Sequence, residues 1–354
     1  MAHAPPGPSW SVQAWRGLAR AALVLWLLLL ALLALAMALG RARPASEGLL
    51  FISERDGNQE IYLLDLRVGH AFNVTRHPAH DYDPVWSPHG DRVAFVSERE
   101  GNQEVYLLDL GTGAARNLTR HPAADFHPAW SPDGQRLAFV SRRDGNAEVY
   151  LLDLPTGALR NLTRHPQSDL APVWSPDGRQ IAFTSLRGGA FALYALDVSS
   201  GQVRRLAGHL TANAHHAWSP DGGRIAFRSN RDGSAEITVL HLDTGQIEFL
   251  PHHPQPDFAL SWSPDGNWIA LEAQDDTNRE IYAADLRQGR VRNVSNSPAT
   301  DLSPVWSPDG RWIAFVSYRQ RGDLEIFAVD VRSGQVRNLT RYFPANDYGV
   351  RWWP

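Results

Sequence analysis

The sequence has no cysteine and little net charge, and each of these absences narrows what the protein can be. Without cysteine the chain forms no disulfide, no thiolate metal site and no lipid-modified N-terminal cysteine. Its formal net charge of -4 gives no basic field to attract a phosphate backbone, so we expect no nucleic-acid partner. Also missing are the Gly-x-Ser-x-Gly nucleophile elbow, the His-Glu-x-x-His pair and the phosphate-binding Gly-x-x-x-x-Gly-Lys-Ser/Thr run. These absences argue against an enzyme.

Long hydrophobic runs are absent as well, except for one at residues 21–40. This run has no charge and contains ten leucines, which at roughly -0.5 kcal/mol each favour membrane insertion by about 5 kcal/mol. Twenty such residues can cross a bilayer, so we expect a transmembrane anchor. A signal peptide cleaved after Ala36-Met37-Ala38 is the alternative, although the run is longer than the usual apolar core of about 7 to 15 residues. Arginines flank the run on both sides, so charge alone does not orient it.

The rest of the chain is a repeat marked by seven tryptophans in one frame. The interval is 44 residues except for the last, which is 46: Trp86, Trp130, Trp174, Trp218, Trp262, Trp306 and Trp352. Each copy holds short apolar stretches separated by Ser-Pro-Asp-Gly, Arg-Asp-Gly-Asn and Thr-Gly turn sequences, which is typical of strands. In the third copy, strand a ends at Trp130, and strands b, c and d are expected at 136–141, 148–154 and 158–163. Four antiparallel strands in a unit of about 40 to 45 residues predict a blade of a β-propeller.

The two ends of the repeat region complete each other. The first copy, from Leu49 to Arg76, has strands b, c and d but no strand a, and residues 347–354 supply only a strand a. Pairing them in one sheet closes a ring of seven blades and leaves no exposed edge. The predicted organisation is therefore a tail at 1–20, an anchor at 21–40, a linker at 41–46 and an all-β, seven-bladed propeller at 47–354.

The repeat motifs resemble those of a known family. Pro-x-Trp-Ser-Pro-Asp-Gly, Ile/Leu-Ala-Phe-x-Ser, Arg-Asp-Gly, Glu-Ile/Val-Tyr-x-x-Asp and Asn-Leu-Thr are similar to the WD40-like (PD40) repeat of TolB-type propellers, over residues 47–354. The resemblance implies a propeller on the outer, periplasmic side of a bacterial inner membrane, with a binding or scaffolding role. TolB itself has six blades and a separate N-terminal domain, so the seven copies and the anchor depart from its pattern.

One acidic position recurs five residues before each tryptophan, where strand a would start beside the central channel. Such a ring can bind a cation or a basic peptide, and it consists of Asp81, Asp125, Asp169, Asn213, Asp257, Asp301 and Asp347. Most copies also carry an arginine between strands b and c: Arg55, Arg99, Arg143, Arg187, Arg231 and Arg319. We favour the structural interpretation, in which each aspartate pairs with a nearby arginine, because every blade needs what every blade repeats.

A second recurrent position is histidine in five copies: His77, His121, His165, His209 and His253, with Ser297 and Tyr342 in the other two. Copies in different blades are too far apart to share a zinc ion. The repeat fails near the fourth and fifth copies, which makes a candidate ligand site of His209, Asn213, His215, His216, His252 and His253, although drift of a surface loop explains the same residues. Asn-x-Thr/Ser sequences recur with strand d, and we interpret them as structural.

Two functions from different classes follow. The first is a non-catalytic, membrane-anchored platform without a cofactor, which binds a protein or an envelope polymer. The alternative is a metal-dependent polysaccharide lyase or hydrolase, known among similar seven-bladed propellers, that would use histidines between His209 and His253 as ligands.

Overall fold

A computed structural model describes residues 48–210, 215–230, 233, 235–250, 257–320, 322–341 and 344–354. Within them 28 strands form seven antiparallel sheets of four, as the sequence predicts. Strands b, c and d of blade I are β1 (Gly48–Ser53), β2 (Glu60–Asp65) and β3 (His70–Asn73), and its strand a is β28 (Asp347–Trp352). Blades II to IV are β4 (Asp81–Trp86), β5 (Arg92–Ser97), β6 (Glu104–Asp109), β7 (Ala114–Asn117); β8 (Asp125–Trp130), β9 (Arg136–Ser141), β10 (Glu148–Asp153), β11 (Leu159–Asn161); β12 (Asp169–Trp174), β13 (Gln180–Ser185), β14 (Ala192–Asp197), β15 (Val203–Ala207). Blades V to VII are β16 (His216–Trp218), β17 (Arg224–Ser229), β18 (Glu236–His241), β19 (Ile247–Phe249); β20 (Asp257–Trp262), β21 (Trp268–Gln274), β22 (Arg279–Asp285), β23 (Arg290–Asn293); β24 (Asp301–Trp306), β25 (Trp312–Gln320), β26 (Asp323–Asp330), β27 (Val336–Asn338).

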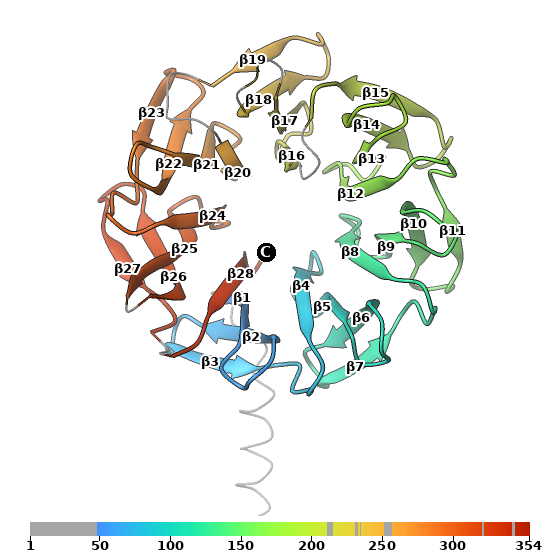
Figure 1. Ribbon diagram of the computed structural model, residues 1–354, viewed down its shortest axis with the longest axis horizontal. Coiled ribbons are helices and arrows are strands. Elements are labelled where there is room, and N and C mark those ends of the chain that lie inside the picture. The colour runs from blue at the N-terminus through green and yellow to red at the C-terminus, as the bar shows by residue number, and fades with distance from the viewer. Residues whose placement is uncertain are drawn as a thin grey trace, which may run out of the picture. The chain divides into compact units, whose positions relative to one another are not determined.

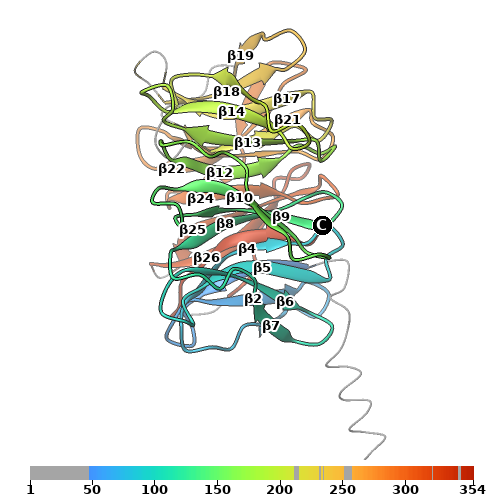
Figure 2. The ribbon, with the colours of Figure 1, turned by 90° about the vertical axis from the view of Figure 1, so that its right-hand side faces the viewer.

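The blades surround a central channel, with strand a of each sheet innermost and strand d outermost (Figure 1). The strands run between two opposite faces of the ring, which Figure 2 shows from the side. We call the face with the a–b and c–d turns, among them Ser131–Gly134, the turn face. The opposite face, with the b–c and d–a connections, is the loop face. Every strand a therefore begins at the loop face and ends at the turn face.

The a–b turn owes its shape to its four residues. In blade III the Gly134 amide donates to the Ser131 carbonyl at 2.9 Å, and the Ser131 hydroxyl accepts the Arg136 amide at 2.9 Å. Gly134 has φ 64°, a left-handed conformation that glycine adopts without steric cost. The same sequence therefore produces the same reversal wherever it recurs.

Strand d is shorter than the sequence suggests, because its last residues bond elsewhere. In blade III it covers Leu159–Asn161 and not 158–163. The Asn161 side-chain oxygen accepts the amides of Thr163 and Arg164 at 3.0 and 3.1 Å, which ends the ladder in an Asx turn. The Asn-x-Thr motif is thus a strand terminator, as its structural interpretation requires.

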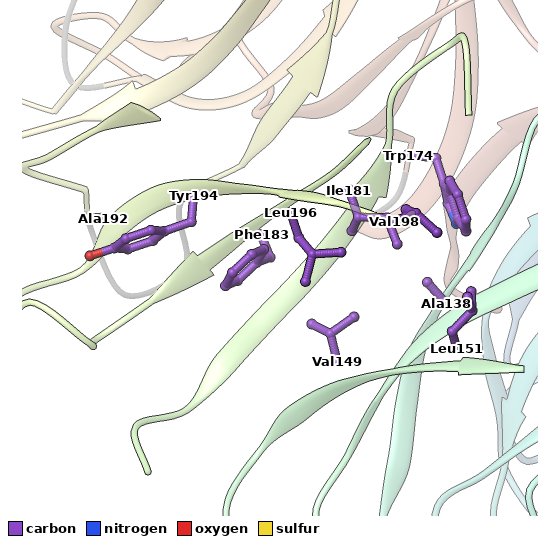
Figure 3. Packing of buried hydrophobic residues seen from close by; sticks show 10 residues of the cluster. All are labelled: Ala138, Val149, Leu151, Trp174, Ile181, Phe183, Ala192, Tyr194, Leu196 and Val198. Atoms are coloured by element: carbon purple, nitrogen blue, oxygen red, sulfur yellow. The ribbon is translucent and has the colours of Figure 1, made fainter. Parts of the chain in front are cut away.

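The hydrophobic core lies between neighbouring sheets. The cluster in Figure 3 joins two blades, with Ala138, Val149 and Leu151 from blade III and Trp174, Ile181, Phe183, Ala192, Tyr194, Leu196 and Val198 from blade IV or the residue after its strand c. Similar clusters join the other blades, so both faces of each sheet are covered. This explains why strands b and c are apolar without strict alternation.

The tryptophans that mark the repeat also connect adjacent blades. In six of the seven copies the indole Nε1 donates to the backbone carbonyl just before the tryptophan of the preceding blade, as Trp174 does to Ala129 at 3.1 Å. The same bond is made by Trp86, Trp130, Trp218, Trp262 and Trp352. Trp306 differs, since its backbone amide donates to the Ser261 hydroxyl at 3.2 Å. The tryptophan is therefore a connector between blades.

The ring closes as the sequence predicts, by pairing of the two ends of the repeat region. Strand β28 is antiparallel to β1, with Ser53 opposite Asp347 and Leu49 opposite Trp352. Beyond β28, the Trp353 indole donates to the Gly90 carbonyl of blade II at 3.2 Å. The closing strand is thus hydrogen-bonded to β1 within its own sheet and, through Trp353, linked to blade II.

The predicted anchor at 21–40 lies outside the described residues. Within the described part of the chain, no helix is long and apolar enough to span a membrane.

Candidate functional site

The repeated aspartates are buried and paired inside their own blades. All five described carboxylates have no exposed surface, and each accepts from the arginine of the b–c loop at 2.6 to 2.9 Å. The pairs are Asp81–Arg99, Asp125–Arg143, Asp169–Arg187, Asp301–Arg319 and Asp347–Arg55. The structural interpretation is confirmed at these positions. Asn213, Arg231 and the Asp257 side chain lie outside the described residues, and a binding role for the ring stays a prediction.

Each of these arginines also stacks on aromatic rings. In blade IV the Arg187 guanidinium lies 5.1 Å from the ring centroids of both Phe183 and Tyr194, and its Nε donates to Ser185 at 3.1 Å. The chain has no lysine, which fits this site because only the planar guanidinium can stack and pair with a carboxylate at once. Burial raises the pKa of Asp169 above its ordinary value, although the hydrogen bond from Ser185 and the charge of Arg187 act in the opposite direction. The pair is therefore a desolvated part of the blade.

The repeated histidines bond to the backbone of their own loop. His165 Nδ1 accepts the backbone amide of Gln167, two residues later in the chain, at 3.1 Å. His77 and His121 each accept the amide two residues later in the same way. The loop is held by a buried glutamate, since Glu148 accepts the Thr163 hydroxyl and the His165 amide, both at 3.0 Å. These histidines shape the d–a connection.

The irregular histidines only partly fall in the described region. His209 is exposed, with φ 60°, and His216 is buried where blades II, III, IV and VII have proline. Asn213, His252, His253 and Tyr342 lie outside the described residues. Within the described segments, no three His, Asp or Glu side chains are placed to hold a metal ion. The residues described thus do not fit a metal, and the metal-dependent alternative stays a prediction.

Blades V and VI carry a departure from the repeat that sequence reasoning overlooked. One position of strand b is apolar or threonine in five blades, namely Ile52, Val96, Val140, Thr184 and Val316, and is fully or almost fully buried. The same position is Arg228 in blade V and Glu272 in blade VI. Aligning the seven copies, which the 44-residue interval allows, would have revealed these charges.

These two charges border an aromatic side chain at the loop face. Phe258, at the start of β20, has the Arg279 guanidinium 3.7 Å from its ring centroid and that of Arg228 at 5.3 Å. Glu272 accepts from Arg279 at 3.1 Å and from the Ser303 amide of blade VII at 2.9 Å. Burial raises the pKa of Glu272 above its ordinary value. We call Arg228, Phe258, Glu272 and Arg279 the V–VI patch.

His215 lies next to the patch, just before strand a of blade V. The side chain is exposed, yet partial desolvation by nearby protein atoms lowers its pKa, and the charges of Arg351 and Arg228 act in the same direction. A neutral imidazole, two guanidinium groups and a ring offer contacts for recognition. The V–VI patch is suited to binding.

Comparison with family models matches most of the chain to one family. The model of the TolB beta propeller domain (PD40) matches residues 37–124, 101–217 and 214–350. A search of curated proteins finds no match.

Solved structures share the propeller at low identity, which shows the fold alone. TolB from Acinetobacter baumannii is 22% identical, with a TM-score of 0.58 over 84% of this chain and 79% of its own. The oligogalacturonate lyase from Vibrio parahaemolyticus is 18% identical, with a TM-score of 0.68 over 81% of this chain and 87% of its own. A puromycin-hydrolyzing peptidase from Mycobacterium tuberculosis is 16% identical, with a TM-score of 0.66 over 85% of this chain but 54% of its own. The same fold thus occurs in enzymes and in TolB.

Proposed function

The chain belongs to the TolB β-propeller family, and from this premise we propose that it is a membrane-anchored, non-catalytic platform that binds a protein partner at its loop face. The observation that carries the proposal is the V–VI patch. Arginine and aromatic side chains contribute most of the binding energy in many protein interfaces. Here Arg228 and Arg279 border Phe258, and Arg228 occupies a position of strand b that is apolar or threonine in five other blades.

The repeated polar residues support a non-catalytic role through the contacts they already make. The carboxylates of Asp169 and Glu148 accept from Arg187 and from Thr163, and the repeated His165 accepts a backbone amide. Groups engaged in this way hold the blade together and are not available as a general acid or base. Recognition then depends on the side chains that differ between blades.

The apolar run at 21–40 is the proposed membrane anchor. By analogy with the family, the propeller would then lie on the extracytoplasmic side of the membrane.

Site-specific photocrosslinking in cells tests this proposal. We would place benzoylphenylalanine at Phe258 in the patch, at Leu170 in the same frame of blade IV, and at the exposed Thr156 on the turn face. We expect a light-dependent adduct from position 258, a weaker one from 170, and none from 156. Replacing Arg279 by glutamine should reduce the adduct several-fold relative to the amount of folded protein, which is measured separately because this variant leaves the buried Glu272 without its ion-pair partner.

Two results would contradict the proposal. One is an adduct of equal yield at position 156, because contact would then not be confined to the loop face. The other is the absence of any adduct at position 258 in cells that make the folded protein.

A further inference from the structure

The turn-face end of the channel widens into a cavity of about 460 Å³ that is broadly open to solvent. Its volume is within the range of small-molecule sites. Five of the strand-a tryptophans line it: Trp86, Trp130, Trp262, Trp306 and Trp352. These residues come from blades I, II, III, VI and VII, so the cavity lies on the ring axis and not in a groove between two blades. Most of its other lining residues are apolar, among them the proline rings of three a–b turns.

Among the described residues that line this cavity, Arg351 is the one charged side chain, and none is a carboxylate. The residue before the strand-a tryptophan is small or aliphatic in the other six copies: Val85, Ala129, Val173, Ala217, Ser261 and Val305. Arg351 is thus a single departure from the repeat, in the strand that reaches the centre of the ring beside the chain end marked in Figure 1. The sequence alone shows this departure, but only the closed ring places it in the channel.

Arg351 has no acidic partner among the described residues. Its recorded hydrogen bond runs from Nη1 to the carbonyl of its neighbour Val350, at 3.0 Å. By contrast, Arg55 in the same blade pairs with the buried Asp347 at 2.9 Å. The charge of Arg351 is also felt at His215, on the opposite side of the ring, whose pKa it helps to lower. The guanidinium thus lies in the wall of this cavity, where no described carboxylate lies beside it.

We propose that this cavity binds a small aromatic carboxylic acid, with its carboxylate on Arg351 and its ring against the tryptophans. A guanidinium binds a carboxylate through two parallel hydrogen bonds, and a partly desolvated, uncompensated charge gains most from such a partner. Among these indoles, Trp86 and Trp352 are only half-buried and offer apolar surface to an aromatic body, while Trp130, Trp262 and Trp306 are buried and contribute their edges. The site lies at the turn face, so it is independent of the partner proposed for the loop face.

Calorimetric titration of the full-length protein in detergent tests this site, with naphthoate as the probe and naphthamide as its uncharged analogue. The informative variant is Arg351→Val, because valine occupies this position in three other blades and fits the fold. Arg351→Lys keeps the charge but loses the two-pronged geometry. Arg179→Gln is the control, since Arg179 is 82% exposed on the turn face and does not line the cavity.

We expect naphthoate to bind the parent protein and the Arg179→Gln variant equally. Affinity should fall at least tenfold in Arg351→Val and by less in Arg351→Lys, while naphthamide binds weakly and alike to all four proteins. The proposal is overturned if naphthoate does not bind the parent, or if Arg351→Val, melting like the parent, binds it equally well. Loss of the loop-face crosslink would leave these titrations unchanged, so the two proposals fail separately.

Discussion

Removing the carboxylate of Asp169 should destabilise the protein by an amount that the structure lets us estimate. Asp169 is fully buried, and its partner Arg187 is 13% exposed, at 2.7 Å. Breaking a buried ion pair by removing one partner costs about 3 to 5 kcal/mol, because the other charge is left without compensation. For roughly 300 residues, with an unfolding entropy of about 2.1 cal/mol/K per residue, this corresponds to a melting point lower by about 5 to 8 °C.

The assay is a double-mutant cycle on the full-length protein, followed by circular dichroism on heating and by denaturant titration. Asp169→Asn and Arg187→Met should each be strongly destabilising, but the double variant should lose less than their sum, because neither charge is then left alone. Arg179→Gln in the same blade is the control. Its pair with Asp177 is 3.9 Å long and exposed, so its loss should cost about 1 kcal/mol or less.

The repeat supplies further tests of the same reasoning, since Asp81, Asp125, Asp301 and Asp347 have the same environment. Equal losses in every blade would support a role in folding. An Asp169→Asn protein as stable as the parent, or single losses that simply add in the double variant, would refute the ion-pair argument.

Three other outcomes are expected. In denaturant titrations, Gly90→Ala should lower the free energy of unfolding by about 1 to 3 kcal/mol more than Gly134→Ala. Both glycines have φ near 65°, but only a Cβ at position 90 would overlap the Trp353 indole. Equal losses would show that Trp353 does not fix the closing strand. Deleting β28 should lower the melting temperature more than any single substitution, since it exposes the edge of β1 and removes the partner of a buried arginine; unchanged melting would contradict ring closure. Replacing Arg351 by glutamine should raise the pKa of His215 toward its ordinary value in a histidine NMR titration, because a repelling charge is lost; an unchanged pKa would mean that Arg351 does not face the channel.

The fold could be predicted from the sequence because each local signal occurs several times at the same offset. A single Ser-Pro-Asp-Gly is only a turn, but its recurrence every 44 residues, just after a tryptophan, sets the strand order of a whole blade. The missing strand a of the first copy and the isolated strand a at 347–354 then left one way to close the ring. The boundaries of strand d were less predictable, since Asn161 ends the strand through side-chain bonds that strand propensity does not describe.

Contacts between blades could not be predicted in the same way. The acceptor of the Trp174 indole is the carbonyl of Ala129, 45 residues earlier, and this pairing depends on how two twisted sheets stack. The place of Glu272 is a similar case. Its charge is visible in the sequence, but its bond to the Ser303 amide of the next blade appears only in three dimensions.

Electrostatics explains why the repeated charges are paired within their own blades, while the proposed sites lie at exceptions to the repeat. Carboxylates repeated around one axis repel each other through a poorly screened interior, so a repeated acid is tolerated only if each copy is neutralised within its blade. The arginine that follows each described aspartate by 18 residues, or pairs across the closed ends as Arg55 does with Asp347, meets this requirement. A charge that occurs in one blade only has no like charges in the other blades to repel it. Leaving it without an oppositely charged partner therefore destabilises the fold less. Arg351 is such a charge, and departures like it are where a propeller built from copies can acquire a binding site without weakening every blade.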